Sequence, residues 1–193
     1  MSMDAILTST AIVALAEIGD KTQLLAIVLA TRFRRPVPII LGILLATLAN
    51  HYLAALVGQE VANLLDSLWF RYAVGASFLA MALWTLVPDS LDDEEATENA
   101  RFGAFLTTLI AFFIVEMGDK TQIATIALGA QYQDALAVMM GTTIGMMLAN
   151  VPAVFVGHII IEKAPLPVIR SVAALLFLVI GLWVLAQTAG LVG

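Results

Sequence analysis

The sequence predicts an all-α integral membrane protein, in which six transmembrane helices form two three-helix repeats of inverted topology. Three observations predict this fold. Of the 193 residues, 61% are hydrophobic and 12% are charged, which is about half the charged fraction of an ordinary soluble domain. Apolar segments long enough to cross a bilayer recur six times along the chain. A polar heptapeptide in the first of these segments returns almost unchanged in the fourth.

Each predicted span ends at charged, proline or turn-forming residues. A hydrocarbon core of about 30 Å requires roughly 20 helical residues. By this criterion the spans cover residues 5–30, 37–59, 68–88, 103–130, 135–161 and 167–188. The breaks between them fall, in order, at residues 32–38, 60–66, 89–98, 131–134 and 162–167. The first and fourth spans exceed the required length, so we expect them either to tilt or to break at Gly19 and Gly118.

The second half of the chain repeats the first. Residues 17–23 read E-I-G-D-K-T-Q, and residues 116–122 read E-M-G-D-K-T-Q, 99 positions later. Three more residues of the first half recur at the same offset: Arg71 as Arg170, Phe78 as Phe177, and Trp84 as Trp183. Because each half holds an odd number of spans, the second half enters the membrane from the opposite side. The predicted organisation is one membrane domain with a first repeat at 1–88, an acidic linker at 89–102 and a second repeat at 103–193.

The distribution of basic residues predicts the orientation, because Lys and Arg accumulate in cytoplasmic loops. Arg71 lies on one side of the predicted membrane, and the other side receives Arg32, Arg34, Arg35, Arg101, Lys163 and Arg170. This asymmetry places both termini outside the cytoplasm and the linker inside it. The linker carries six of the fifteen acidic residues. We interpret it as a solvated connector or, alternatively, as a weak cation-collecting segment.

The composition also excludes several classes of function. Cysteine is absent, which excludes disulfides, thiolate metal sites and cysteine nucleophiles. No cluster of basic residues suits nucleic acid, and we expect neither enzymatic activity nor a resident cofactor. The N-terminal apolar run does not resemble a cleavable signal peptide, because it lacks a basic start and contains Glu17, Asp20 and Lys21. The expected partners are the lipid bilayer and a solute; oligomerisation is not required, and a dimer is compatible with the pattern.

The charged residues of both heptapeptides fall near the middle of their spans. An ionised side chain at the bilayer centre costs about 2.5–3.5 kcal/mol on insertion scales, so these groups should face one another or a wet cavity. Residues that are three and four positions apart share one face of a helix. The six charged side chains therefore form two groups: Glu17, Asp20 and Lys21 in the first motif, and Glu116, Asp119 and Lys120 in the second. The inverted repeat predicts that the two groups meet in one site at the midplane.

The charge and the ligand types of this site indicate a divalent cation that exchanges with protons. Four carboxylates and two ammonium groups sum to −2, which one divalent ion or two protons would neutralise. The candidate donors that accompany the carboxylates all offer oxygen: Thr22, Thr121, Gln23, Gln122, Asn50 and Asn150. Sites of this kind suit Ca²⁺, Mg²⁺ and Mn²⁺, and fit copper or zinc poorly. Lys21 and Lys120 would balance the charge.

Simpler interpretations of these residues remain open. Residues 17 and 21, and likewise 116 and 120, could form ion pairs within one helix. Asn50 and Asn150 could join neighbouring helices by hydrogen bonds. The lysines could occupy the empty site as tethered cations, or they could hold the aspartates in place. Gly19 and Gly118 could permit close packing, or they could let the helix unwind so that backbone carbonyls reach the ion.

Two features are not repeated in both halves. In the second and fifth spans the offset is 100, because one residue is inserted: residues 48–50 and residues 148–150 both read L-A-N. His51 follows Asn50, but its counterpart is Val151, so we do not expect His51 to be a ligand that both halves supply. Four methionines crowd the fifth span, at positions 139, 140, 146 and 147. A thioether could favour Mn²⁺ over Ca²⁺, although methionine more often fills gaps in a core.

With an E-x-G-D-K-T motif on each of spans one and four, the whole chain resembles the Gdt-type cation–proton antiporter family. Its eukaryotic members are Golgi calcium/manganese transporters, and its bacterial members include Mne-type manganese exporters. The resemblance implies that four residues bind the ion, namely Glu17, Asp20, Glu116 and Asp119. It places Thr22, Thr121, Gln23 and Gln122 beside them. It also implies a bacterial inner-membrane manganese exporter, and the choice of Mn²⁺ over Ca²⁺ comes from this analogy alone.

We therefore expect a secondary transporter that exports a divalent cation, Mn²⁺ or else Ca²⁺, in exchange for protons by alternating access. Two other classes remain open: a passive divalent-cation channel, and an exporter of a small cationic metabolite such as a basic amino acid. An inverted repeat within one chain favours alternating access, since channels usually assemble symmetrically around a pore.

Overall fold

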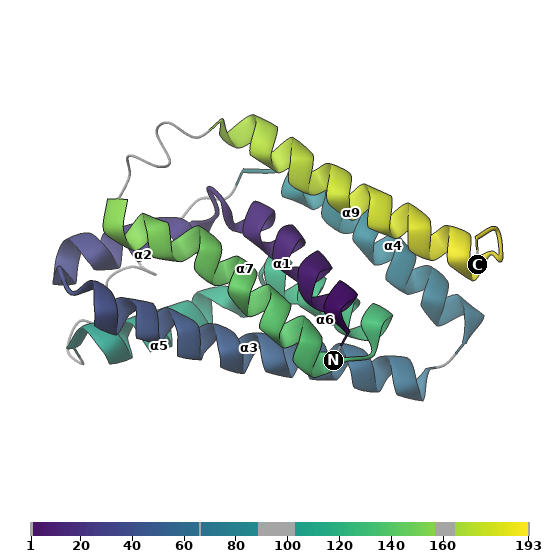
Figure 1. Cartoon of the computed structure of the whole chain (residues 1–193), viewed down its shortest axis with the longest axis horizontal. Coiled ribbons are helices and arrows are strands. Elements are labelled where there is room, and N and C mark those ends of the chain that lie inside the picture. Colours follow the sequence, from purple (N-terminus) through teal and green to yellow (C-terminus); the bar gives the residue numbers. More distant parts are fainter. Residues whose placement is uncertain (1, 66, 89–102, 157–164, 193) are drawn as a thin grey trace.

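The computed structural model describes residues 2–65, 67–88, 103–156 and 165–192, and within these ranges it contains eight helices and no strand (Figure 1). In chain order the helices are α1 (Met3–Glu17), α2 (Lys21–Phe33), α3 (Pro36–Leu64), α4 (Leu68–Thr85), α5 (Gly103–Glu116), α6 (Lys120–Tyr132), α7 (Ala135–Val156) and α9 (Leu166–Thr188). The all-α prediction is confirmed. The acidic linker at 89–102 and the predicted end of the fifth span lie outside the described residues.

Three helices in the described part of the chain are long and apolar enough to cross a membrane: α3, α7 and α9. They begin within a residue of the second, fifth and sixth predicted spans, and α5 is a shorter apolar helix. Large apolar side chains also point away from the protein, such as Trp69, Leu83 and Leu148, which are 85%, 72% and 58% exposed. This outward apolar surface is suited to lipid.

The first and fourth predicted spans are broken helices, so the structure adopts the second of the two expected alternatives. α1 and α2 are separated by residues 18–20, and α5 and α6 by residues 117–119. Gly19 and Gly118 have φ angles of 80° and 79°, in the left-handed region that glycine adopts without a steric penalty. At each break, the last carbonyl groups of one half-helix therefore lie near the first N–H groups of the next half-helix.

The close approaches of glycines show how the long helices run. Gly42 lies against Phe105 and Gly58 against Ile126, so α3 runs in the same direction as the α5–α6 segment. Gly141 lies against Ile6 and Gly145 against residue 10, so α7 runs parallel to α1. Small residues permit such close helix contacts within a membrane.

The helices α4 and α9 form an antiparallel pair along one edge of the molecule (Figure 1). Gly75 packs against Leu185, and Gly181 packs against Leu79. The pair contacts the remaining helices through α1, which packs on α9, and α6, which packs on α4.

The aromatic rings of Phe78 on α4 and Phe177 on α9 meet inside this pair, with centroids 6.5 Å apart. These two residues are 99 positions apart, so they are the counterparts of each other in the repeat. Both are fully buried in one hydrophobic cluster, which also includes Ile12 of α1 and Leu128 of α6. The core therefore joins elements of both halves.

The packing of α3 on α6 predicts a stability effect at Gly58. A Cβ at this position would collide with backbone atoms of Ile126 and would lie 2.9 Å from the backbone nitrogen of Ala130. We expect Gly58→Val to destabilise the fold by about 1–3 kcal/mol, as overpacking usually does, and to lower the thermal unfolding midpoint in detergent. Val57→Ala is the control, because Val57 is 51% exposed. Equal midpoints for both variants would contradict this packing.

Candidate metal centre

Three buried carboxylates converge where the two helices break. Glu17 is the last residue of α1, whereas Asp20 and Asp119 are the N-cap residues of α2 and α6. One carboxylate oxygen from each of the three lies within 4.8 Å of the other two. Their exposed fractions are 0%, 1% and 5%. Oxygen atoms from both motifs therefore gather in a buried space, which is an arrangement suited to a cation.

The lysines pair across the two motifs. Lys120 Nζ lies 3.0 Å from Asp20 Oδ1, and Lys21 Nζ lies 3.3 Å from Asp119 Oδ1. Each motif thus supplies the lysine that neutralises the aspartate of the other motif. Of the alternatives that the sequence leaves open, this geometry favours lysines that hold the aspartates in place.

Glu17 is hydrogen-bonded by one threonine from each motif. The Thr22 hydroxyl donates to Oε2 and the Thr121 hydroxyl donates to Oε1, each over 2.5 Å. Both threonines are buried. Because each carboxylate oxygen has two lone pairs, both oxygens of Glu17 can still accept a cation while these hydrogen bonds persist.

Glu116, the counterpart of Glu17, has different surroundings. It is fully buried, and neither of its oxygens has a hydrogen-bond partner among the described residues. His51 Nε2 lies 3.7 Å from Glu116 Oε2. His51 is also fully buried, and its two ring nitrogens likewise have no hydrogen-bond partner in the described ranges. Sequence comparison of the two halves gave His51 little weight, because its counterpart is Val151.

The glutamines of the motifs hold the helix breaks in shape. The Gly19 N–H donates to Gln23 Oε1 over 2.8 Å, and the Gly118 N–H donates to Gln122 Oε1 over 2.7 Å. The side-chain nitrogen of Gln23 then donates to a backbone carbonyl on α7, and that of Gln122 donates to Asn50 Oδ1 on α3. Each glutamine thus ties its break to a neighbouring helix.

The two asparagines differ in their contacts. Asn50 Nδ2 donates to the Phe113 carbonyl over 3.3 Å, which joins α3 to α5. Asn150 Nδ2 donates to the Met146 carbonyl over 3.1 Å within α7, and Asn150 Oδ1 is buried without a partner among the described residues. Asn50 therefore acts as an interhelical link here, whereas Asn150 has an acceptor oxygen available.

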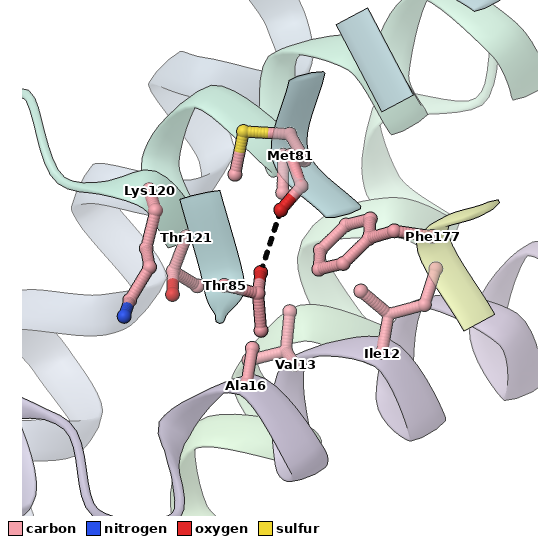
Figure 2. Close-up of a pocket in the computed structure, with 9 residues that line it drawn as sticks. Ile12, Val13, Ala16, Met81, Thr85, Lys120, Thr121 and Phe177 are labelled. Carbon is pink, nitrogen blue, oxygen red and sulfur yellow. Dashed lines mark hydrogen bonds between the residues drawn. The ribbon is translucent and has the colours of Figure 1, made fainter. Parts of the chain in front are cut away.

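A small void lies beside the cluster. It borders Lys120 and Thr121 and is lined mostly by apolar side chains, with Phe177, Ile12 and Val13 opposite these two residues (Figure 2). It has no room for a water molecule. Among the charged side chains of the two motifs, Lys21 is the most exposed, at 21%.

Comparison with known proteins gives a consistent result across the chain. A family model described as "Divalent cation/proton antiporter GDT1" matches residues 5–93 and 104–191. A Vibrio cholerae protein named "Putative manganese exporter" is 54% identical over 181 residues, which cover 93% of this chain and 90% of that protein. The "GDT1-like protein 5" of Arabidopsis thaliana is 26% identical over 211 residues, covering 90% of this chain and 92% of the relative. No solved structure matches.

The crossed ion pairs predict the outcome of a double-mutant cycle. Asp20→Asn or Lys120→Met alone leaves a buried charge without its partner, and each should destabilise the protein by about 3–5 kcal/mol. The double variant should lose much less than the sum of the two. Thermal unfolding in detergent measures the coupling, and the Asp20→Asn/Lys21→Met cycle is the matched control. Stronger coupling within the motif than across the motifs would contradict the geometry.

Proposed function

Because the chain belongs to the GDT1 divalent cation/proton antiporter family, we propose that it is a secondary transporter that exports Mn²⁺ from the cytoplasm in exchange for protons, with Ca²⁺ as a second substrate. The observation that carries this proposal is the buried cluster of Glu17, Asp20 and Asp119, with oxygens of all three within 4.8 Å. The name of the Vibrio cholerae relative supports manganese as the substrate.

Charge explains why transport would be an exchange. The four carboxylates and two lysines of the motifs sum to −2 when all are ionised, and each crossed pair joins one lysine to one aspartate. The remaining charges belong to Glu17 and Glu116, both fully buried. A buried net charge without a counterion is unfavourable. The site is therefore expected to hold either one divalent ion or two protons, and it would exchange one for the other rather than empty.

The directions of the helices support two inverted three-span repeats. α1 runs parallel to α7 and α3 runs parallel to the α5–α6 segment, whereas α4 and α9 are antiparallel. If six consecutive spans cross the membrane in alternating directions, all three of these helix pairs have the observed relative direction. The same alternation makes α1 and α5 run in opposite directions. We propose that the first repeat covers 1–88 and the second 103–193, with the termini outside the cytoplasm of a bacterial inner membrane.

The unlike surroundings of the two breaks support alternating access. A Cβ at Gly19 would lie 2.7 Å from the side chain of Leu166 at the start of α9, whereas a Cβ at Gly118 would meet no atom of the described residues within 4 Å. Gly118 is also exposed, and Gly19 is buried. In transporters built from inverted repeats, one repeat rocks against the other around a fixed site. The two breaks would exchange these surroundings as the site opens to the other side.

The roles of the polar residues follow from their contacts. Glu17, Asp20, Glu116 and Asp119 would bind the ion or the protons, and Lys21 and Lys120 would hold the aspartates in place through their ion pairs. The hydroxyls of Thr22 and Thr121 would turn toward or away from the ion. The carbonyl oxygens of Gln23 and Gln122 already accept backbone N–H groups, so we assign them to the shape of the breaks. Asn50 and Asn150 would complete the lining.

The proton coupling can be tested in proteoliposomes. We expect Mn²⁺ loaded inside to leave when the external pH is lower, with protons entering in step, because the ion and the protons neutralise the same carboxylates. A fluorescent pH indicator and a Mn²⁺-quenched dye would record the two fluxes together. Mn²⁺ movement that ignores an imposed pH gradient would sink the exchange mechanism, and very fast flux would indicate a channel.

Neutralising either glutamate should abolish transport. Glu17→Gln and Glu116→Gln each remove one of the two charges that the lysines leave uncompensated, so neither variant should hold a divalent ion in the shared site. Mn²⁺ efflux from vesicles would be compared with that of wild type, with Asp92→Asn in the acidic linker as the control. Folded protein in the membrane must be confirmed for each. Full activity in either glutamine variant would refute a site shared by both motifs.

A further inference from the structure

The four carboxylates of the two motifs are not equivalent in this structure. Glu17 accepts a hydroxyl on each oxygen and lies with both aspartates, whereas Glu116 lies beside His51. Glu116 and His51 together bury four polar atoms that have no hydrogen-bond partner among the described residues. Buried polar atoms without partners are rare in native folds and require an explanation, and a bound ion is one explanation.

The spacing of the two side chains suits a shared metal ion. His51 Nε2 and Glu116 Oε2 are 3.7 Å apart, which is too far for a hydrogen bond. First-row divalent ions bind nitrogen and carboxylate oxygen at about 2.0–2.2 Å, so two donors on one ion lie about 3 to 4 Å apart. The observed separation falls within that interval.

We propose that His51 and Glu116 form a second cation station, which binds a first-row transition metal ion through one imidazole nitrogen and one carboxylate. This inference rests on the proposed function, because it assigns the metal preference of that transport site. Both side chains are fully buried. Glu116 is the last residue of α5, and Asp119 is the N-cap of α6 after the same break, so the station adjoins the carboxylate cluster.

The imidazole supplies a preference that oxygen donors lack. Ca²⁺ and Mg²⁺ bind oxygen ligands, whereas transition metal ions also accept imidazole nitrogen. The Glu17 cluster offers oxygen only and would accept any of these ions. An ion that must also be held by His51 is selected for its affinity for nitrogen. Because Val151 stands at the equivalent place in the second half, this preference comes from one repeat alone.

Magnetic resonance of bound Mn²⁺ tests the coordination directly. His51 and His158 are the two histidines of the chain, so protein labelled with ¹⁵N-histidine reports on two residues. We expect pulsed electron paramagnetic resonance of Mn²⁺ bound to the wild type to show a hyperfine coupling to nitrogen. This coupling should change from that of ¹⁴N to that of ¹⁵N when the histidines are labelled. The coupling should vanish in His51→Gln and remain in His158→Gln. A wild-type spectrum without histidine nitrogen, or a coupling lost only in His158→Gln, would overturn the proposal.

Transport measurements separate the failure of this inference from failure of the proposed function. In vesicles, His51→Gln should lower the preference for Mn²⁺ over Ca²⁺ by at least about tenfold, since even outer-shell partners of a metal contribute 10–100-fold to affinity. Val151→Ala, at the equivalent place, should leave the preference unchanged. If His51→Gln exports Mn²⁺ with unaltered preference, the station is wrong and the transport function stands. If the wild type itself neither binds nor moves Mn²⁺, both proposals fall.

Should His51→Gln fail to fold, the labelled wild-type spectrum still decides the question, because it requires no substitution. Isotope-dependent coupling supports the station, and its absence rejects it.

Discussion

The constraint on which this structure depends is the placement of six charged side chains within the apolar body of the protein. Charges buried in that environment must be compensated by partners or by an ion. The crossed pairs, Asp20 with Lys120 and Asp119 with Lys21, compensate four of them. Each pair joins the two halves of the chain, so these contacts hold the halves together. In the proposed mechanism, the order of residues in E-x-G-D-K-T has a physical meaning: the aspartate and the lysine join the halves, and the glutamate would exchange ion for proton.

The helix breaks give this arrangement its electrostatic frame. α1 and α5 end at Glu17 and Glu116, where the last carbonyl groups of each helix carry partial negative charge. α2 and α6 begin at Asp20 and Asp119, where free N–H groups carry partial positive charge. The aspartates are therefore stabilised by their own half-helices, whereas a cation is stabilised by the ends of the preceding ones. An unbroken helix would place all of these groups in internal hydrogen bonds and would offer the ion side chains alone.

Much of this arrangement can be predicted from the sequence, and the reasons for the exceptions are specific. The repeat fixes which residues correspond, and glycine beside aspartate in an overlong apolar span indicates a break. Lys21 pairs with Asp119 and not with a residue of its own motif. This pairing depends on how the two broken helices face each other, and the spacing of residues along the chain does not reveal that arrangement. Their side-chain oxygens make the glutamines candidate ligands, yet a side chain four residues after a glycine in the left-handed conformation is also placed to accept a hydrogen bond from that glycine's N–H group. His51 cannot be identified from the repeat, because the equivalent position in the second half is Val151.

The two differences between the halves have different origins, and this separates conformation from selectivity. Thr22 and Thr121 occur in both motifs but bind only Glu17 here, so this difference belongs to the conformation. In an inverted repeat, Glu116 is the equivalent of Glu17. The same two hydroxyls would therefore donate to Glu116 when the site opens to the other side of the membrane. His51 has no counterpart, since Val151 stands in its place, and no rocking motion can transfer an imidazole to the first motif. In the proposed exchange of conformations, the hydrogen bonds of the two glutamates would alternate, while the nitrogen donor would stay with Glu116. A transporter built this way would move its ion through nearly symmetric steps and would still select the metal at a single place.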